Sequence, residues 1–185
     1  EERIQGLRIF CEYRDSRSFP LLLPLLDQPC PVERMSVVYA LGRNPCPSAV
    51  EKLVSLLKTD DNAYVRRATA WSLANYDNQI VLEPLINALK NDVAAVRLWS
   101  SSSLAEIGNV SLKNAQLAAE QLLISLKIDN EPGVRSNCIW SLCRLYEKLN
   151  NTLQESFVDE CTKIALFDKE PSVMEEAKTA LDSMG

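Results

Sequence analysis

The stretch DDNAYVRRATAWSL, residues 60–73, decides the fold of this 185-residue chain. It opens with Asp60, continues to the pair Val65-Arg66, and ends at Leu73, seven residues after that arginine. Apolar residues at intervals of three and four mark one face of an α-helix. The stretch therefore predicts a polar turn followed by an amphipathic helix.

The same signature recurs along the whole chain, and internal repetition of this kind indicates a fold built from repeated structural units. Each copy of the Val-Arg pair has a leucine seven residues after its arginine, and so do the counterparts Val32-Glu33-Arg34 and Val173-Met174, counted from Arg34 and Met174. The leucines in this position are Leu41, Leu73, Leu104, Leu142 and Leu181. A partial copy begins at Arg3, with Phe10 in the leucine position. The chain thus opens inside a repeat, and we expect an upstream part of that repeat, or a cap, to be missing.

Each unit carries another helical segment before its Val-Arg helix, with apolar residues at i, i+3, i+4 and i+7. These first segments span residues 19–26, 49–57, 80–89, 119–126 and 157–166. A polar turn with an aspartate separates the two segments, and we expect that aspartate to cap the second helix. The turn aspartates are Asp27, Asp60, Asp92, Asp129 and Asp168. Pro20, Pro24 and Pro84 fall in or near first segments, where proline kinks a helix.

The pattern resembles the HEAT-repeat family and, within it, the short bacterial repeats of phycobilisome (phycobilin) lyases. The residues that carry the resemblance are Asp60 with Val65 to Leu73, and Asp92 with Val96-Arg97 and residues 104–108. The resemblance implies an all-α fold, an α-solenoid of about five helix pairs plus an N-terminal half-repeat. We expect a single domain over residues 1–185, with a half-repeat at 1–13 and repeats at about 18–43, 48–76, 79–108, 114–148 and 152–184. The last two intervals are longer, and we expect the excess in loops around residues 108–115 and 147–152.

Composition and charge exclude several classes of function. The chain has 20 Lys and Arg against 25 Asp and Glu, a net charge of −5, which argues against nucleic acid as a partner. It has no histidine, which removes Ser-His-Asp and Cys-His catalysis and every histidine-based metal site. No apolar run approaches the roughly 18 residues of a membrane span, and no signal-peptide pattern opens the chain. We expect a cytoplasmic protein that binds neither membrane nor nucleic acid.

The repeated arginine and the cysteines are interpreted as structural. The arginine column consists of Arg3, Arg34, Arg66, Arg97 and Arg135, and we expect each to bond a turn aspartate of its own or a neighbouring repeat. Cys11, Cys138 and Cys143 occupy positions where the other repeats mostly carry small residues, which indicates packing. An iron–sulfur or redox-linked role through exposed Cys30, Cys46 or Cys161 remains a weaker alternative.

A column of aromatic residues is the main functional hint. Five residues after the repeat arginine stand Tyr39, Trp71 and Trp140, while two other repeats carry Ser102 and Thr179. Trp99 takes a neighbouring position. In the HEAT pattern this column sits on the second helix and faces the concave surface. Exposed aromatic patches often mark binding sites, although these rings could instead pack on the adjacent repeat.

Three arginines lie near this column, namely Arg43, Arg67 and Arg144. Arginine beside an aromatic face can bind carboxylates while a partner's side chain stacks on the ring. The sequence therefore predicts a non-enzymatic protein-binding scaffold or adaptor that holds a protein partner on its concave face without a cofactor. The alternative, implied by the resemblance, is a phycobilin lyase or bilin chaperone subunit that binds phycocyanobilin and acts with a phycobiliprotein or a second lyase-like subunit.

Overall fold

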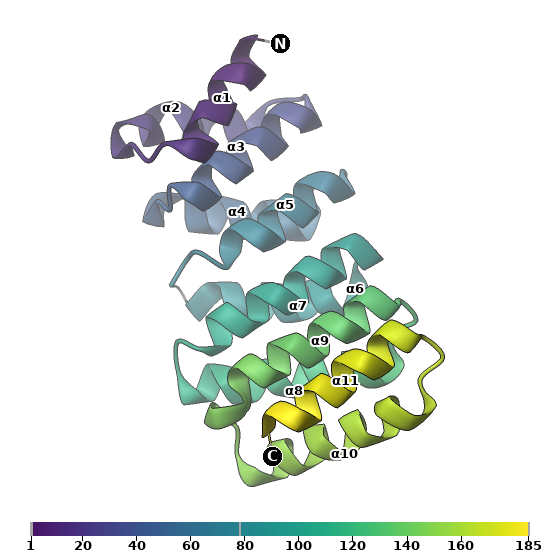
Figure 1. The fold of residues 1–185 in the computed structure, drawn as a ribbon. Coiled ribbons are helices and arrows are strands. Elements are labelled where there is room, and N and C mark those ends of the chain that lie inside the picture. Colours follow the sequence, from purple (N-terminus) through teal and green to yellow (C-terminus); the bar gives the residue numbers. More distant parts are fainter. Residues whose placement is uncertain (1, 78, 185) are drawn as a thin grey trace.

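The structure is a computed structural model that describes residues 2–77 and 79–184, without the side chain of Arg3. These residues form α-helices and short 3-10 helices and contain no strand. The helices stack in chain order from α1 at one end to α10 and α11 at the other (Figure 1). The predicted all-α solenoid is confirmed.

Two layers of helices make up the stack. The layer drawn in front in Figure 1 contains the Val-Arg helices. They are α1 (Glu2–Glu12), α3 (Pro31–Arg43), α5 (Ala63–Leu73), α7 (Ala94–Gly108), α9 (Pro132–Leu145) and α11 (Pro171–Met184). The layer behind it contains α2 (Phe19–Leu22), α4 (Val50–Thr59), α6 (Leu82–Asn91), α8 (Leu112–Ile128) and α10 (Asn151–Phe167). Five 3-10 segments connect or extend these helices: Ser16–Ser18, Leu23–Asp27, Pro47–Ala49, Gln79–Val81 and Tyr146–Lys148.

The Val-Arg helices line the inner side of the curved stack. Neighbouring helices of this layer, such as α3 with α5, contact each other much more extensively than neighbouring first helices, such as α4 with α6. Helices that stand closer together lie on the shorter, concave side of a solenoid. We call the exposed surface of the Val-Arg helices the inner face and that of the first helices the outer face.

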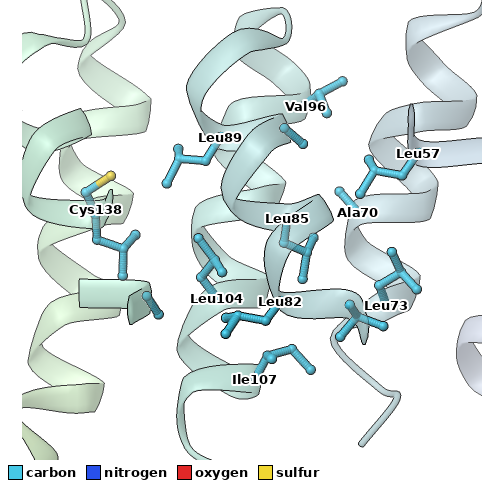
Figure 2. Close-up of a cluster of buried hydrophobic side chains, with 14 of the residues drawn as sticks. Leu57, Ala70, Leu73, Leu82, Leu85, Leu89, Val96, Leu104, Ile107 and Cys138 are labelled. Atoms are coloured by element: carbon cyan, nitrogen blue, oxygen red, sulfur yellow. The ribbon is translucent and has the colours of Figure 1, made fainter. Parts of the chain in front are cut away.

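The repeated leucines form the spine of the core between the two layers. Leu41, Leu73, Leu104 and Leu142 are fully buried. Figure 2 shows Leu73 and Leu104 with Leu82, Leu85 and Ile107 between consecutive repeats. Because each repeat buries its apolar stripes against its neighbours, the core runs unbroken along the stack.

The first helix pair is irregular for a local reason. Its first segment is divided between α2 and the 3-10 turn Leu23–Asp27. Pro20 and Pro24 lie at the starts of these two pieces. Each proline lacks an N–H and clashes with the preceding turn, so a continuous α-helix cannot form there.

The extra length of the last two intervals does not lie in loops, contrary to our expectation for residues 108–115 and 147–152. It lengthens the first helices: α4 and α6 have 10 residues each, whereas α8 and α10 have 17. Ser111 and Asn150 cap the N-termini of the longer helices by accepting backbone N–H bonds from Asn114 and Leu153. Such caps stabilise a helix start by about 1 kcal/mol.

Within residues 2–77 and 79–184, no helix combines the length and the apolar character that a bilayer-spanning segment needs.

Candidate functional site

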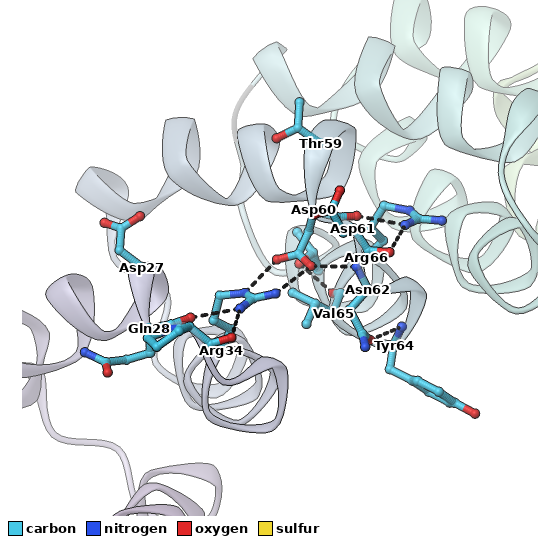
Figure 3. Close-up of polar contacts among 12 residues, drawn as sticks. Asp27, Gln28, Arg34, Thr59, Asp60, Asp61, Asn62, Tyr64, Val65 and Arg66 are labelled. Carbon is cyan, nitrogen blue, oxygen red and sulfur yellow. Dashed lines mark hydrogen bonds and ion pairs between the residues drawn. The ribbon is translucent and has the colours of Figure 1, made fainter.

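A ladder of arginine–aspartate pairs joins consecutive repeats along one edge of the stack. Each of the four column arginines whose side chains the structure describes donates two hydrogen bonds to the turn aspartate of the following repeat. Arg34, for example, bonds Asp60 through Nε at 2.8 Å and Nη2 at 2.9 Å. Its Nη1 donates to the carbonyl of Gln28 in its own turn (Figure 3). The other rungs are Arg66–Asp92, Arg97–Asp129 and Arg135–Asp168.

The ladder is a structural device rather than an anion-binding surface. The guanidinium groups of its four described rungs already bind carboxylates at 2.7–3.0 Å, and the arginine side chains are largely buried, with exposed fractions of 12–20%. Fork-to-fork pairing of this type fixes the angle between the paired groups as well as their distance. The structural interpretation of these four arginines is confirmed, whereas the side chain of Arg3 lies outside the described residues.

The aspartates of the ladder do not cap the second helices as we expected. The carboxylate of Asp60 accepts the N–H of Asn62, and Asn62 is itself the N-cap of α5. Asp129 and Asp168 likewise accept an N–H two residues on, from Glu131 and Glu170. The aspartate therefore shapes the turn before the helix, because its other bonds go to the arginine of the preceding repeat.

Electrostatics follow from this geometry. Burial alone would raise the pKa of the Asp60 carboxyl, but the hydrogen bonds from Arg34 and from the Asn62 N–H outweigh burial and hold that pKa below its usual value. The pKa of Asp92 and the pKa of Asp168 are lowered for the same combination of reasons. The carboxylates of Asp60, Asp92 and Asp168 are thus ionised across the neutral range.

On the inner face, α3 and α5 bring together four of the predicted site residues. The rings of Tyr39 and Trp71 lie 5.4 Å apart, tilted by 58°. The Arg43 guanidinium lies 5.3 Å from the centre of the Trp71 ring, and Nη2 of Arg67 lies 3.3 Å from the Tyr39 hydroxyl. Tyr64 completes the group, 5.5 Å from the Arg67 guanidinium. We call these five residues the α3–α5 cluster.

Trp71 is held by its neighbours on the preceding repeat. A Cβ atom added to Gly42 would lie 2.6 Å from Cζ3 of Trp71, so the indole passes directly over the glycine. Tyr39 and Trp71 are both half-buried. Both rings are therefore partly packed against neighbouring side chains and partly exposed.

A second group lies further along the inner face, on α7 and α9. The Arg144 guanidinium lies 4.9 Å from the centre of the Trp140 ring and donates to Glu106 at 2.8 Å. Trp140 is 40% exposed. We call Glu106, Trp140 and Arg144 the α7–α9 cluster. Beside it, an open hollow of about 310 Å³ is lined by Trp140 together with Ser102, Gly133, Ser136, Asn137 and Glu176.

The aromatic column is not continuous. Ser102 interrupts it on α7, where Nδ2 of Asn137 donates to the Ser102 hydroxyl at 2.6 Å. Trp99 is 36% exposed on the same helix, and no ring contact links it to either cluster in the described part of the chain. The structure therefore gathers six of the seven predicted site residues into two separate clusters and leaves Trp99 between them.

Two members of the clusters, Tyr64 and Glu106, were not among the predicted site residues. Tyr64 stands two residues before the repeat arginine, and its spacing of three from Arg67 on a helix could have indicated their contact. Glu106 pairs with Arg144 across 38 residues of sequence, and that contact depends on how α7 and α9 pack. Both residues stand nine positions after a repeat arginine, Arg97 or Arg135, so the repeat spacing places them at equivalent positions on neighbouring helices.

The six cysteines differ in their burial. All six are free. Cys138 and Cys161 are fully buried and Cys46 is 5% exposed, so the expectation that Cys46 and Cys161 are exposed is wrong; of that group, Cys30 is exposed. The described residues contain no group of three or more Cys, Asp or Glu side chains that could hold a metal ion. Burial raises the pKa of Cys161 to about 12.

The sequence matches the profile of one protein family. The profile described as HEAT repeats matches residues 1–74 and 50–143, which together cover most of the chain. No curated protein matches the chain significantly.

Solved structures share the architecture at low sequence identity. One chain of the complex of CpcE and CpcF of phycocyanin lyase from Nostoc sp. PCC7120 superposes with a TM-score of 0.67 at 22% identity, covering 90% of this chain and 99% of that one. A designed armadillo repeat protein in complex with the peptide (KR)4 gives 0.66 at 18% identity, covering 98% and 91%. An engineered protein gives 0.69 at 20% identity, covering 98% and 90%. At these identities the likeness shows the fold alone.

Proposed function

The chain belongs to the HEAT-repeat family, and on that premise we propose that it is a non-enzymatic scaffold or adaptor whose inner face holds a segment of a protein partner. The observation that carries the proposal is the pair of arginine–aromatic clusters along that face. Aromatic and arginine side chains dominate the energetics of protein interfaces. The stacked helices hold them in place before binding, which lowers the ordering cost of association.

Packing supports a rigid receptor. Trp71 is fixed between Gly42 and Tyr39, and the ladder on the neighbouring edge locks the repeats to one another. By contrast Trp140 is 40% exposed beside an open hollow, so its ring is available for stacking. A partner segment running across α3, α5, α7 and α9 would meet both clusters. We place such a partner in the cytoplasm, where free thiols persist.

A selection from a displayed library of random peptides tests the proposal, since it does not require the natural partner to be identified. Selected peptides are measured against the wild type, an inner-face variant with Arg43→Ala and Trp140→Ala, and an outer-face control with Leu117→Ala and Ile124→Ala. The residues of the control are 39% and 49% exposed on α8. The inner-face variant is expected to lose about tenfold or more in affinity, as hot-spot truncations do.

The outer-face control is expected to bind like the wild type. Peptides that bind all three proteins equally, or that lose affinity on the outer-face control, would refute the assignment of the inner face. Thermal unfolding of each variant separates lost binding from lost fold.

A second candidate is a bilin-binding subunit of a phycobilin lyase or chaperone. The stacking of Arg43 on Trp71 and of Arg144 on Trp140 suits a flat conjugated molecule with two propionate groups, such as phycocyanobilin. Its test is a titration with phycocyanobilin followed by induced circular dichroism and tryptophan quenching. A saturable signal that disappears in the Trp140→Ala variant supports this candidate, and a flat titration removes it.

A further inference from the structure

We propose that the α3–α5 cluster recognises carboxylate side chains, so that the partner segment is acidic where it crosses these two helices. The inference rests on the proposed function and specifies the chemistry of the partner. Its basis is the electrostatic state of Arg43 and Arg67, which have no carboxylate partner among the described residues, whereas the ladder arginines and Arg144 have one.

Arg43 and Arg67 carry charges that the described residues do not neutralise. The arginines of the ladder pair with aspartates, and Arg144 pairs with Glu106. Within residues 2–77 and 79–184, by contrast, no carboxylate lies within ion-pair distance of Arg43 or Arg67. The α3–α5 cluster therefore contains two positive charges without a carboxylate partner, and a negatively charged segment would supply that partner.

Arg67 is also short of hydrogen-bond acceptors. A guanidinium has five N–H donors. In the described part of the chain, Arg67 donates a single bond from its side chain, to the Tyr39 hydroxyl at 3.3 Å, and its buried Nε has no acceptor. Arg66, the adjacent residue, donates to both carboxylate oxygens of Asp92 and to the carbonyl of Asp60. The contrast indicates that the Arg67 guanidinium has donor capacity left for a ligand.

The aromatic rings orient these guanidinium groups. Arg43 lies over Trp71, and Arg67 lies over Tyr64. A guanidinium that lies over a ring face can still direct unpaired N–H groups away from the ring, and these can donate to a carboxylate. The rings supply apolar contact area beside the charges, which favours a peptide that alternates acidic with apolar residues.

The rest of the inner face argues against an extended polyanion such as nucleic acid. Toward the C-terminal end it carries Glu106, whose charge Arg144 balances, Glu175, which pairs with Lys178, and Glu176 on α11. Glu176 lines the hollow beside Trp140. A phosphate backbone that followed the face beyond α5 would meet these carboxylates, and the chain as a whole carries a net charge of −5. A partner segment that is acidic over α3 and α5, and neutral or basic toward the C-terminal end of the inner face, fits this charge distribution.

Three fluorescein-labelled peptides test the inference: (EA)4, (QA)4 and (KA)4, with the oligonucleotide (dT)12 as a fourth probe. Fluorescence anisotropy of the wild type at low salt is expected to show (EA)4 binding about tenfold or more tighter than (QA)4, and no saturable binding of (KA)4. Arg43→Gln and Arg67→Gln are each expected to remove most of the difference between (EA)4 and (QA)4. Arg144→Gln, the matched change in the α7–α9 cluster, is expected to leave it within about twofold, since Glu106 already balances that charge.

Equal binding of (EA)4 and (QA)4, tighter binding of (dT)12 than of (EA)4, or an equal loss in Arg144→Gln would each overturn the inference. The proposed function would survive any of these results if library-selected peptides still require the inner face. The proposed function would be refuted together with the inference only if neither the designed peptides nor the library-selected peptides depended on inner-face residues for binding.

Discussion

The guanidinium of Arg66 on α5 spans the gap to the next repeat and holds both carboxylate oxygens of Asp92, at 2.8 and 2.7 Å. Its Nη1 donates at the same time to the carbonyl of Asp60 at the start of its own repeat. One side chain thus links the turns of two consecutive repeats. In a stack whose stability depends on contacts between neighbours, this link couples the folding of each repeat to the next.

Replacing Arg66 with methionine, the residue that takes this position in the last repeat, is expected to destabilise the protein by about 2–4 kcal/mol. The change leaves the largely buried Asp92 carboxylate without its partner, and an uncompensated buried charge is costly. Urea unfolding monitored by circular dichroism measures the effect. Arg144→Met is the control, because its pair with Glu106 is exposed and contributes less than about 1 kcal/mol.

The ladder also predicts a pH dependence of stability. The folded-state pKa values of Asp60, Asp92 and Asp168 lie below the ordinary value of about 3.9. Between the folded and unfolded pKa values the unfolded chain binds more protons, so the contribution of these groups is full above about pH 4 and is lost as the pH falls through the folded pKa.

Urea midpoints at pH 7, 4 and 3 test this dependence. The wild type is expected to lose more stability between pH 4 and pH 3 than the Arg66→Met variant, which lacks one rung. An identical loss in both proteins would mean that the rung does not shift the titration of Asp92.

Gly42 is expected to tolerate no side chain. A Cβ atom there would lie 2.6 Å from the Trp71 ring and 3.2 Å from the backbone of Ser72, so Gly42→Ala forces α3 and α5 apart. We expect the free energy of unfolding to fall by about 1–3 kcal/mol, as is typical of overpacking, and the tryptophan fluorescence to change.

Gly133→Ala is the matched control on α9. Its Cβ would meet Leu98 at an ordinary 3.4 Å, and replacing a helical glycine with alanine is expected to be neutral or to stabilise the protein by up to about 1 kcal/mol. Equal effects at the two glycines would contradict this account.

Thiol reactivity is expected to single out Cys30. It is exposed, whereas Cys46, Cys138 and Cys161 are buried, and burial raises the pKa of the half-buried Cys143 to about 11. Titration with Ellman's reagent at pH 8 should show one fast thiol in the folded protein and all six after denaturation. Cys30→Ser should remove the fast phase. Rapid reaction of Cys46 or Cys161 in that variant would contradict the packing described above.

The sequence alone determined the repeat, the class of fold and the structural role of the arginine column. These depend on periodicity within a helix and on spacing within a repeat, which are local properties. Leu73 and Leu104 are buried because every turn of about 3.6 residues returns to the same face, and Arg66 is placed by its distance from the helix start. The cysteine at 138 was assigned to packing on the same ground, and it is fully buried.

Only the tertiary structure decided how consecutive repeats meet. The extra residues before residue 119 lengthen α8 instead of forming a loop, because Ser111 caps the helix at an earlier point. The four aspartates of the ladder bind the arginine of the preceding repeat and do not cap their own second helix. Trp71 packs over Gly42 while Trp140 remains open, although both stand five residues after a repeat arginine. Such differences arise from side chains contributed by another repeat, 26 to 38 residues away in the sequence, and the periodicity within one helix does not encode those contacts.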